Sequence, residues 1–254
     1  MPRRRPGHKR RPASRGALAL AAALVAYNNL LGRWPLFDRA LYVPVNLAAT
    51  GIVAWVGKAL LRLSPEDAGL GDRRLVSAAS GAAWAATLTL PVWPVLLTGK
   101  APLLADRRVA GIGPAALLYR LTIRIPLGTA LFEEMAFRGV LHGAARRESA
   151  CGLRWVPAAA FGLWHLRPAL RLMEINRPGA ARKERAAAAA LAVCVTAAGG
   201  RFLEHLRDRS RGILMPAAFH ACLNDLGALI GFVAARRTPG DSFAFSRPRK
   251  QHAL

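Results

Sequence analysis

Acidic residues and cysteines are scarce in this sequence. It contains 14 Asp+Glu against 37 Lys+Arg, and its 3 cysteines, Cys151, Cys194 and Cys222, are scattered along the chain. This usage excludes a disulfide framework and a cysteine-based metal site, and it favours cysteines that are simply small buried side chains. The HExxH helix of the common zinc proteases is also missing, and no internal repeat is found.

The basic residues are clustered between long apolar runs. The chain of 254 residues is 53% hydrophobic and carries a formal net charge of +23. A basic face on a water-soluble fold would indicate nucleic-acid binding. Arg-rich loops between apolar segments are instead typical of a membrane protein. We therefore expect the lipid bilayer as a partner, and no nucleic acid.

Seven apolar segments are candidates for transmembrane helices, which need roughly 20 largely apolar residues. Pro126 lies inside the fourth segment, whose first part is either interfacial or kinked at the proline, because Pro126 removes a backbone donor. The sequence thus predicts an all-α, polytopic transmembrane bundle of about seven or eight spans with a buried polar cavity. The segments lie at about 16–32, 40–61, 75–98, 115–141, 153–171, 186–203 and 212–235.

The predicted organisation has four parts. The Ala-rich run at 16–32 follows basic residues, and we interpret it as the first span because further spans follow it. The basic N-terminus favours a cytosolic start, and the Arg/Ala-rich composition resembles that of a high-GC bacterium, so we expect a bacterial cytoplasmic membrane. The parts are a basic, disordered cytosolic tail at 1–15, N-terminal transmembrane helices at 16–114, a core at 115–235, and a basic, disordered tail at 236–254.

The most unusual polar group lies in LFEEMAFRG, from Leu131 to Gly139. An ionisable residue at the centre of a transmembrane helix costs about 2.5–3.5 kcal/mol on insertion scales, so such residues are functional candidates. Glu134 and Arg138 are four residues apart and share a helix face, which predicts an ion pair. Glu133 lies about one hundred degrees away from Glu134, so this pair does not explain it.

Two further segments carry polar side chains. His165 follows Phe161 by one turn in AFGLWHL, and His220 precedes Asn224 by one turn in PAAFHACLND. Taken alone, His165 is more often a structural residue than a catalyst, and a His/Asn pair can join helices through hydrogen bonds. Together with Glu133, these groups come from three spans. They avoid lipid at the lowest cost by meeting in the bundle interior.

A carboxylate, two imidazoles and an amide at one place are suited to hydrolysing an amide bond. A glutamate can take a proton from a water that it holds together with a histidine. A second histidine and an asparagine can donate hydrogen bonds to the developing oxyanion. Metal binding is the alternative, because two His, a Glu and an Asn can hold zinc with a water in an open position.

These motifs resemble those of the CAAX prenyl protease and bacteriocin-processing family of intramembrane proteases, also called CPBP or Abi. The family shows EExxxR, then FxxxH, then HxxxN on successive transmembrane helices. Here the three motifs are Glu133 to Arg138, Phe161 to His165, and His220 to Asn224. Each motif is weak alone, whereas the ordered set is specific. The resemblance covers roughly residues 115–235, which it identifies as a CPBP-like catalytic core.

The resemblance implies a role for each motif residue. Glu134, Arg138 and Phe161 are supporting residues. The family has been described both as metalloproteases and as metal-free glutamate-dependent proteases. We favour the metal-free mechanism, because asparagine is a poor zinc ligand compared with His or Cys. The implied catalytic residues, which are also the ligands if zinc is present, are Glu133 as general base, His165 at the water, and His220 and Asn224 at the oxyanion.

The activity that follows is that of an intramembrane endopeptidase acting on a peptide or membrane protein near the membrane surface. A prenylated substrate is not expected in a bacterium. Two alternatives stay open: a non-catalytic membrane scaffold or bacteriocin-immunity protein of the same fold, and a transporter with a buried proton relay. The intact set of four motif residues argues against the scaffold. Transporters often show repeated halves or broken helices, and a membrane-crossing path of polar residues would favour that reading.

Overall fold

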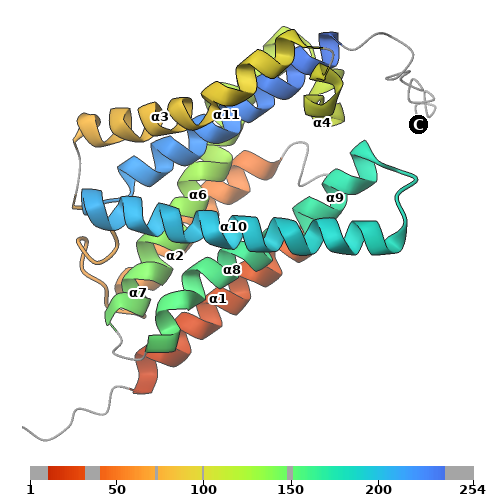
Figure 1. Cartoon of the computed structure of the whole chain (residues 1–254). Coiled ribbons are helices and arrows are strands. Elements are labelled where there is room, and N and C mark those ends of the chain that lie inside the picture. Colours follow the sequence, from red (N-terminus) through yellow and green to blue (C-terminus); the bar gives the residue numbers. More distant parts are fainter. Residues whose placement is uncertain (1–10, 32–40, 72–73, 99, 148–150, 238–254) are drawn as a thin grey trace, which may run out of the picture.

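The computed structural model describes residues 11–31, 41–71, 74–98, 100–147 and 151–237. Within these ranges the chain forms helices and no strand, apart from one isolated bridge between Leu70 and Gly212. The predicted all-α fold is therefore confirmed (Figure 1). The longer helices are α1 (Arg11–Leu31), α2 (Tyr42–Ala59), α3 (Leu75–Thr89), α8 (Val156–Trp164), α9 (Leu166–Asn176), α10 (Arg182–Ser210) and α11 (Leu214–Arg237).

A continuous helix from Pro114 to Arg147 forms the centre of the molecule. It follows the short elements η2 (Leu90–Leu97), η3 (Ala101–Leu104) and α4 (Arg107–Ala110), and η6 (Cys151–Trp155) comes after it. Its own parts, in chain order, are α5 (Pro114–Tyr119), η4 (Arg120–Ala130), α6 (Leu131–Glu133), η5 (Glu134–Leu141) and α7 (His142–Arg147).

Two stretches of this helix, η4 and η5, have wide turns with π-type hydrogen bonds. The N–H of Leu131 donates to the carbonyl of Pro126, five residues earlier. Because Pro126 lacks an N–H and its ring crowds the preceding turn, the wide turn lets the helix continue through the proline. Asn46 of α2 donates from Nδ2 to the carbonyl oxygen of Gly128 at 2.7 Å, which satisfies one backbone acceptor in this stretch.

Four helical segments are long and apolar enough to cross a membrane: Leu75–Leu97, Pro114–Arg147, Arg182–Ser210 and Leu214–Arg237. Only 17–28% of the residues in their apolar windows are buried inside the protein. Large apolar side chains such as Leu75 and Leu191 face outward, whereas Glu134 and Arg138 are buried. This distribution fits a helical bundle surrounded by lipid. The first predicted span corresponds to a shorter apolar helix at Arg15–Leu31.

Glycines set two of the closest helix contacts. A Cβ atom added at Gly81 of α3 would lie 2.2 Å from the carbonyl oxygen of Met215 in α11. At Gly162 of α8, it would lie 2.6 Å from the carbonyl oxygen of Val193 in α10. Figure 1 shows the two consequences: α3 and α11 run side by side along one edge, and α10 crosses over α8.

The fifth predicted span, 153–171, is not a single helix. It is broken at His165, where φ is −86° and ψ is 0°, between α8 and α9. The chain can break here because α1 supplies hydrogen-bond partners. Asn28 donates from Nδ2 to the carbonyl oxygen of Trp164 at 2.9 Å, and Asn29 Oδ1 accepts from the N–H of Arg167 at 2.8 Å.

The predicted ends of the chain fall largely outside the described residues. Residues 1–10 and 238–254 belong to the two tails predicted to be disordered, and the structure does not describe them. α1 begins at Arg11, so 11–15 is helical where the sequence predicted the end of a disordered tail. Arginine and alanine in this stretch are good helix formers, which lets the first helix extend into the basic segment.

Candidate active site

The central helix places Glu133, Glu134 and Arg138 in the interior of the bundle. Their exposed fractions are 4%, 0% and 1%. The backbone around them has wide turns, since the N–H of His142 reaches the carbonyl of Phe137, five residues earlier. Such turns are frequent at functional sites in membrane and soluble proteins.

Glu134 joins two other motif residues. Its Oε1 accepts a hydrogen bond from Nη1 of Arg138 at 3.1 Å, the ion pair predicted from the four-residue spacing. The same oxygen lies 2.8 Å from Nδ1 of His220, which comes from α11. A proton on Nδ1 therefore donates to Glu134 and leaves Nε2 as the free ring nitrogen of His220.

Glu133 is held by a residue that sequence reasoning did not select. Nε1 of Trp164 donates to Oε1 of Glu133 at 3.0 Å. Oε2 of Glu133 is buried and has no hydrogen-bond partner among the described residues, and it lies 3.8 Å from Nε2 of His220. That distance is too long for a direct hydrogen bond. The signal in the sequence was the indole in FGLWH, a donor-only group one residue before His165.

His165 sits at the break between α8 and α9. Its Nδ1 lies 2.8 Å from the carbonyl oxygen of Phe161, so this nitrogen is engaged with the backbone. The Phe161 ring packs edge-on against His165 with centroids 4.7 Å apart, and against His220 with centroids 6.0 Å apart. On its other side the guanidinium of Arg138 lies 3.8 Å from the Phe161 centroid. Phe161 thus contacts both histidines and the arginine.

A cavity of about 700 Å³ connects several of these groups to the surface. Glu133, His165 and Asn224 line it together with Trp164. Asn224 makes no hydrogen bond within the part of the chain that the structure describes, so its amide is available to a ligand. His220 is not among the residues that line the cavity, and it is 7% exposed.

The predicted zinc ligands are not arranged to hold an ion. Zinc takes its protein ligands at about 2.0–2.3 Å. In the described ranges no group of three or more His, Cys, Asp and Glu side chains is placed to bind a metal. The donors present do not fit a zinc site, and we derive no step through a metal.

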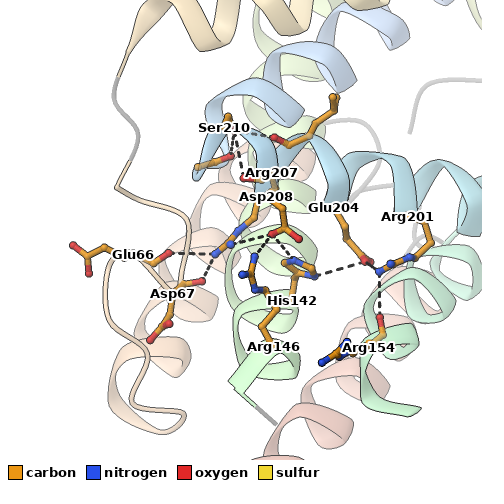
Figure 2. Close-up of polar contacts among 12 residues, drawn as sticks. Glu66, Asp67, His142, Arg146, Arg154, Arg201, Glu204, Arg207, Asp208 and Ser210 are labelled. Carbon is orange, nitrogen blue, oxygen red and sulfur yellow. Dashed lines mark hydrogen bonds and ion pairs between the residues drawn. The ribbon is translucent and has the colours of Figure 1, made fainter. Parts of the chain in front are cut away.

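A second polar cluster lies further along the same helix (Figure 2). Nε2 of His142 is 3.0 Å from Oδ1 of Asp208, and its Nδ1 is 3.6 Å from Oε2 of Glu204. Arg146 pairs with Asp208, and Arg201 pairs with Glu204. The two carboxylates belong to α10, whereas His142 and Arg146 belong to α7. The contacts between them therefore link α10 to α7. Sequence reasoning missed it, although His142 follows Arg138 by one turn.

In a comparison with known protein families, part of the chain matches one family. Residues 115–226 match the family model described as type II CAAX prenyl endopeptidase Rce1-like. The matched region contains all three motifs, so the resemblance predicted from them is confirmed there. No curated protein and no solved structure matches the chain.

Proposed function

From the premise that residues 115–226 belong to the type II CAAX prenyl endopeptidase Rce1-like family, we propose that this protein hydrolyses peptide bonds with a water activated by Glu133. The family and the apolar helices together indicate an integral membrane endopeptidase. The observation that carries the finer proposal is the state of the Glu133 carboxylate. Trp164 fixes one oxygen, while the other is buried without a partner and belongs to a side chain that lines the cavity.

The proposed reaction uses Glu133 twice. Oε2 of Glu133 takes a proton as the water oxygen attacks the carbonyl carbon of the substrate. The C–N bond then breaks as Glu133 returns that proton to the leaving amine nitrogen. His165, which lines the cavity beside Glu133, helps to hold the water.

Asn224 and His220, both on α11, are the residues proposed to stabilise the oxyanion. The Nδ2 amide of Asn224 lines the cavity and donates to the developing negative charge. His220 is the second proposed donor through Nε2, the nitrogen that Glu134 does not engage. Because His220 does not line the cavity in this structure, this role requires Nε2, now 3.8 Å from Oε2 of Glu133, to reach the oxyanion beside Glu133. When the ring carries both protons, Nδ1–H keeps its bond to Glu134 and Nε2–H is the second donor. The pair of Glu134 and Arg138 fixes the ring and so orients Nε2.

The experiment uses the purified protein in liposomes with a mixed peptide library in ¹⁸O-labelled water, read by mass spectrometry. Hydrolysis places one ¹⁸O atom in each new carboxyl group. We expect labelled products from the wild type, insensitivity to chelator, and loss of products in Glu133→Gln. Glu174→Gln is the matched control, because Glu174 is an exposed glutamate outside the cavity lining. Chelator-sensitive cleavage restored by zinc would overturn the metal-free mechanism.

One feature of the central helix resembles the polar path that the transporter alternative requires. Glu134, Arg138, His142 and Arg146 follow one another at four-residue spacing on the central helix, and cavities lie toward both ends of this helix. This stripe is not a proton relay, because the guanidinium of Arg138 in its middle does not release its proton in proteins. If the protein in liposomes conducted protons and the Glu134→Gln variant did not, the transporter alternative would be favoured over the endopeptidase.

A further inference from the structure

Glu204 of α10 is a buried carboxylate that the proposed reaction does not use. It is 2% exposed and belongs to a helix that is long and apolar enough to cross a membrane. A charged side chain in such a helix is costly and is by default a functional candidate. Figure 2 shows Glu204 between His142 and Arg201, within the second polar cluster.

The contacts within that cluster account for only one oxygen of the Glu204 carboxylate. Nδ1 of His142 lies 3.6 Å from Oε2, and Nη1 of Arg201 pairs with the same oxygen. Oε1 is buried and has no hydrogen-bond partner among the described residues. The link between α10 and α7 therefore explains Oε2, whereas Oε1 calls for a different partner.

The guanidinium of Arg138 has complementary atoms without a partner. Its Nη1 donates to Glu134, and its central carbon lies 3.8 Å from the centroid of the Phe161 ring. Nε and Nη2 are buried and make no hydrogen bond within the ranges that the structure describes. Arginine carries five N–H donors in a rigid fork. One edge of this fork is therefore engaged by Glu134, and the other edge is left for a second acceptor.

The second edge of Arg138 faces α10. A Cβ atom at Gly200 would lie 3.5 Å from Nη2 of Arg138. Glu204 follows Gly200 by one helical turn, and helical side chains lean back over the turn that precedes their own Cα. The Glu204 carboxylate thus lies on the Nη2 side of Arg138, and the charge of Arg138 acts on it. Buried polar groups that do not touch directly are commonly bridged by one water.

We propose that Glu204 is a positioning residue of the active site, whose carboxylate holds the second edge of Arg138 and so keeps the first edge on Glu134. Glu134 in turn lies 2.8 Å from Nδ1 of His220 and fixes that ring. This inference rests on the proposed endopeptidase function, in which Nε2 of His220 is an oxyanion donor. It joins the second polar cluster to the active site through one arginine.

The first measurement does not depend on turnover. The protein is labelled with ¹⁵N-histidine in nanodiscs, and the proton on Nδ1 of His220 is observed by NMR and assigned by its absence in His220→Gln. A proton that is donated to a carboxylate resonates downfield. We expect Glu134→Gln to move this signal upfield. Glu204→Gln should move it in the same direction by less, because Arg138 without Glu204 draws more strongly on Glu134.

Asp208→Asn is the matched control. Asp208 lies one turn further along α10, its side chain is 40% exposed, and it is 3.0 Å from Nε2 of His142. Its loss should lower the unfolding temperature and leave the His220 signal and kcat unchanged. Should Glu204→Gln fail to fold, Glu204→Asp replaces it, because it withdraws the carboxylate by one methylene and should move the signal in the same direction.

Cleavage of a fixed peptide then tests the effect on the reaction. We expect Glu204→Gln to lower kcat about tenfold with KM nearly unchanged, because the oxyanion forms only in the transition state. Arg138→Lys keeps the positive charge but lacks the second edge of the fork. In the Arg138→Lys protein, Glu204→Gln should cause no further loss, since its effect passes through Arg138.

Several results would overturn the inference. An unmoved His220 signal in Glu204→Gln, or equal shifts in Glu204→Gln and Asp208→Asn, would reduce Glu204 to a link between helices. So would an unchanged kcat in Glu204→Gln. Additive losses of kcat in the double variant would show that Glu204 does not act through Arg138. Absence of cleavage by the wild type would contradict the proposed function instead, and the NMR result would still decide whether Glu204 holds His220.

Discussion

Trp164 donates from Nε1 to Oε1 of Glu133 at 3.0 Å, across 31 residues of sequence and between two helices. The bond uses one carboxylate oxygen and leaves Oε2 buried without a partner among the described residues. The indole is itself locked in place, because its ring stacks on Tyr27 with centroids 5.9 Å apart and meets Phe137 edge-on at 5.4 Å. The position of Glu133 is therefore set by packing as well as by its own helix.

Replacing Trp164 with phenylalanine is expected to slow peptide cleavage about 10- to 100-fold. The change keeps an aromatic ring but removes the only donor of the indole. A buried carboxylate oxygen left without its donor costs about 1–3 kcal/mol. Cleavage rates with a fixed peptide measure the effect, and Trp155→Phe is the control, because Trp155 is 60% exposed. Equal rates for both variants would show that the bond does not orient Glu133.

Replacing Arg138 with leucine is expected to destabilise the protein by about 3–5 kcal/mol, because it leaves Glu134 buried without its cation. Both members of this pair are at most 1% exposed. Thermal or denaturant unfolding in a defined detergent measures the loss. Glu174→Gln breaks the partly exposed pair with Arg167 and is expected to cost at most about 1 kcal/mol. A similar cost for both variants would contradict the buried pairing.

Two neighbouring glycines of α10 offer a matched comparison. A Cβ atom at Gly200 would lie 3.3 Å from both Ala158 and the Phe161 ring and 3.5 Å from Nη2 of Arg138. A Cβ atom at Gly199 would meet nothing within 4 Å. Gly200→Ala should therefore shift Phe161 and reduce cleavage.

Gly199→Ala is the control variant. Gly199→Ala should leave cleavage unchanged and raise stability by up to about 1 kcal/mol, because alanine favours the helix. Cleavage assays and unfolding curves on the two variants provide the test. Full activity in Gly200→Ala would show that the packing of Phe161 is not critical.

Asp106 is expected to make stability depend on acidic pH. Burial acts to raise the pKa of Asp106, but its hydrogen bonds and ion pair with Arg108 outweigh this and hold the pKa below its usual value. Its side chain also caps α4 by accepting from the N–H of Arg108 at 2.9 Å. The stabilisation is fully present above the unfolded pKa of about 4 and is lost as pH falls through the lower folded pKa.

Unfolding at several pH values tests this dependence. Asp106→Asn should cost about 1 kcal/mol at neutral pH and progressively less below about pH 4, where the carboxylate of the unfolded wild type becomes protonated first and that of the folded protein follows at lower pH. A cost that does not change with pH would mean that Asp106 contributes only as a neutral hydrogen-bond partner.

The sequence predicted what depends on local spacing. The pair of Glu134 and Arg138 followed from four residues of helix, and the all-α fold followed from long apolar runs. The contacts of Glu133 with Trp164 and of Glu134 with His220 join helices 31 and 86 residues apart. No periodicity encodes such contacts, because they depend on how helices pack.

Two features of the helices could also not be predicted from the neighbouring sequence alone. The break at His165 depends on Asn28 and Asn29 of α1, which bind the backbone groups on either side of it. The wide turns around Pro126 keep the central helix continuous through the proline. The break depends on a distant segment and the wide turns on the hydrogen bonding of a long helix, and neither follows from local spacing.

The most direct test of Glu133 as general base is the single-turnover rate of peptide cleavage by Glu133→Gln relative to wild type. General-base catalysis contributes about 10²- to 10⁴-fold, and glutamine keeps the size and the Trp164 acceptor while losing the basic oxygen. We predict a loss within or beyond that range, with an unchanged unfolding temperature and normal cleavage by Glu174→Gln. A Glu133→Gln protein that cleaves at the wild-type rate would contradict the account.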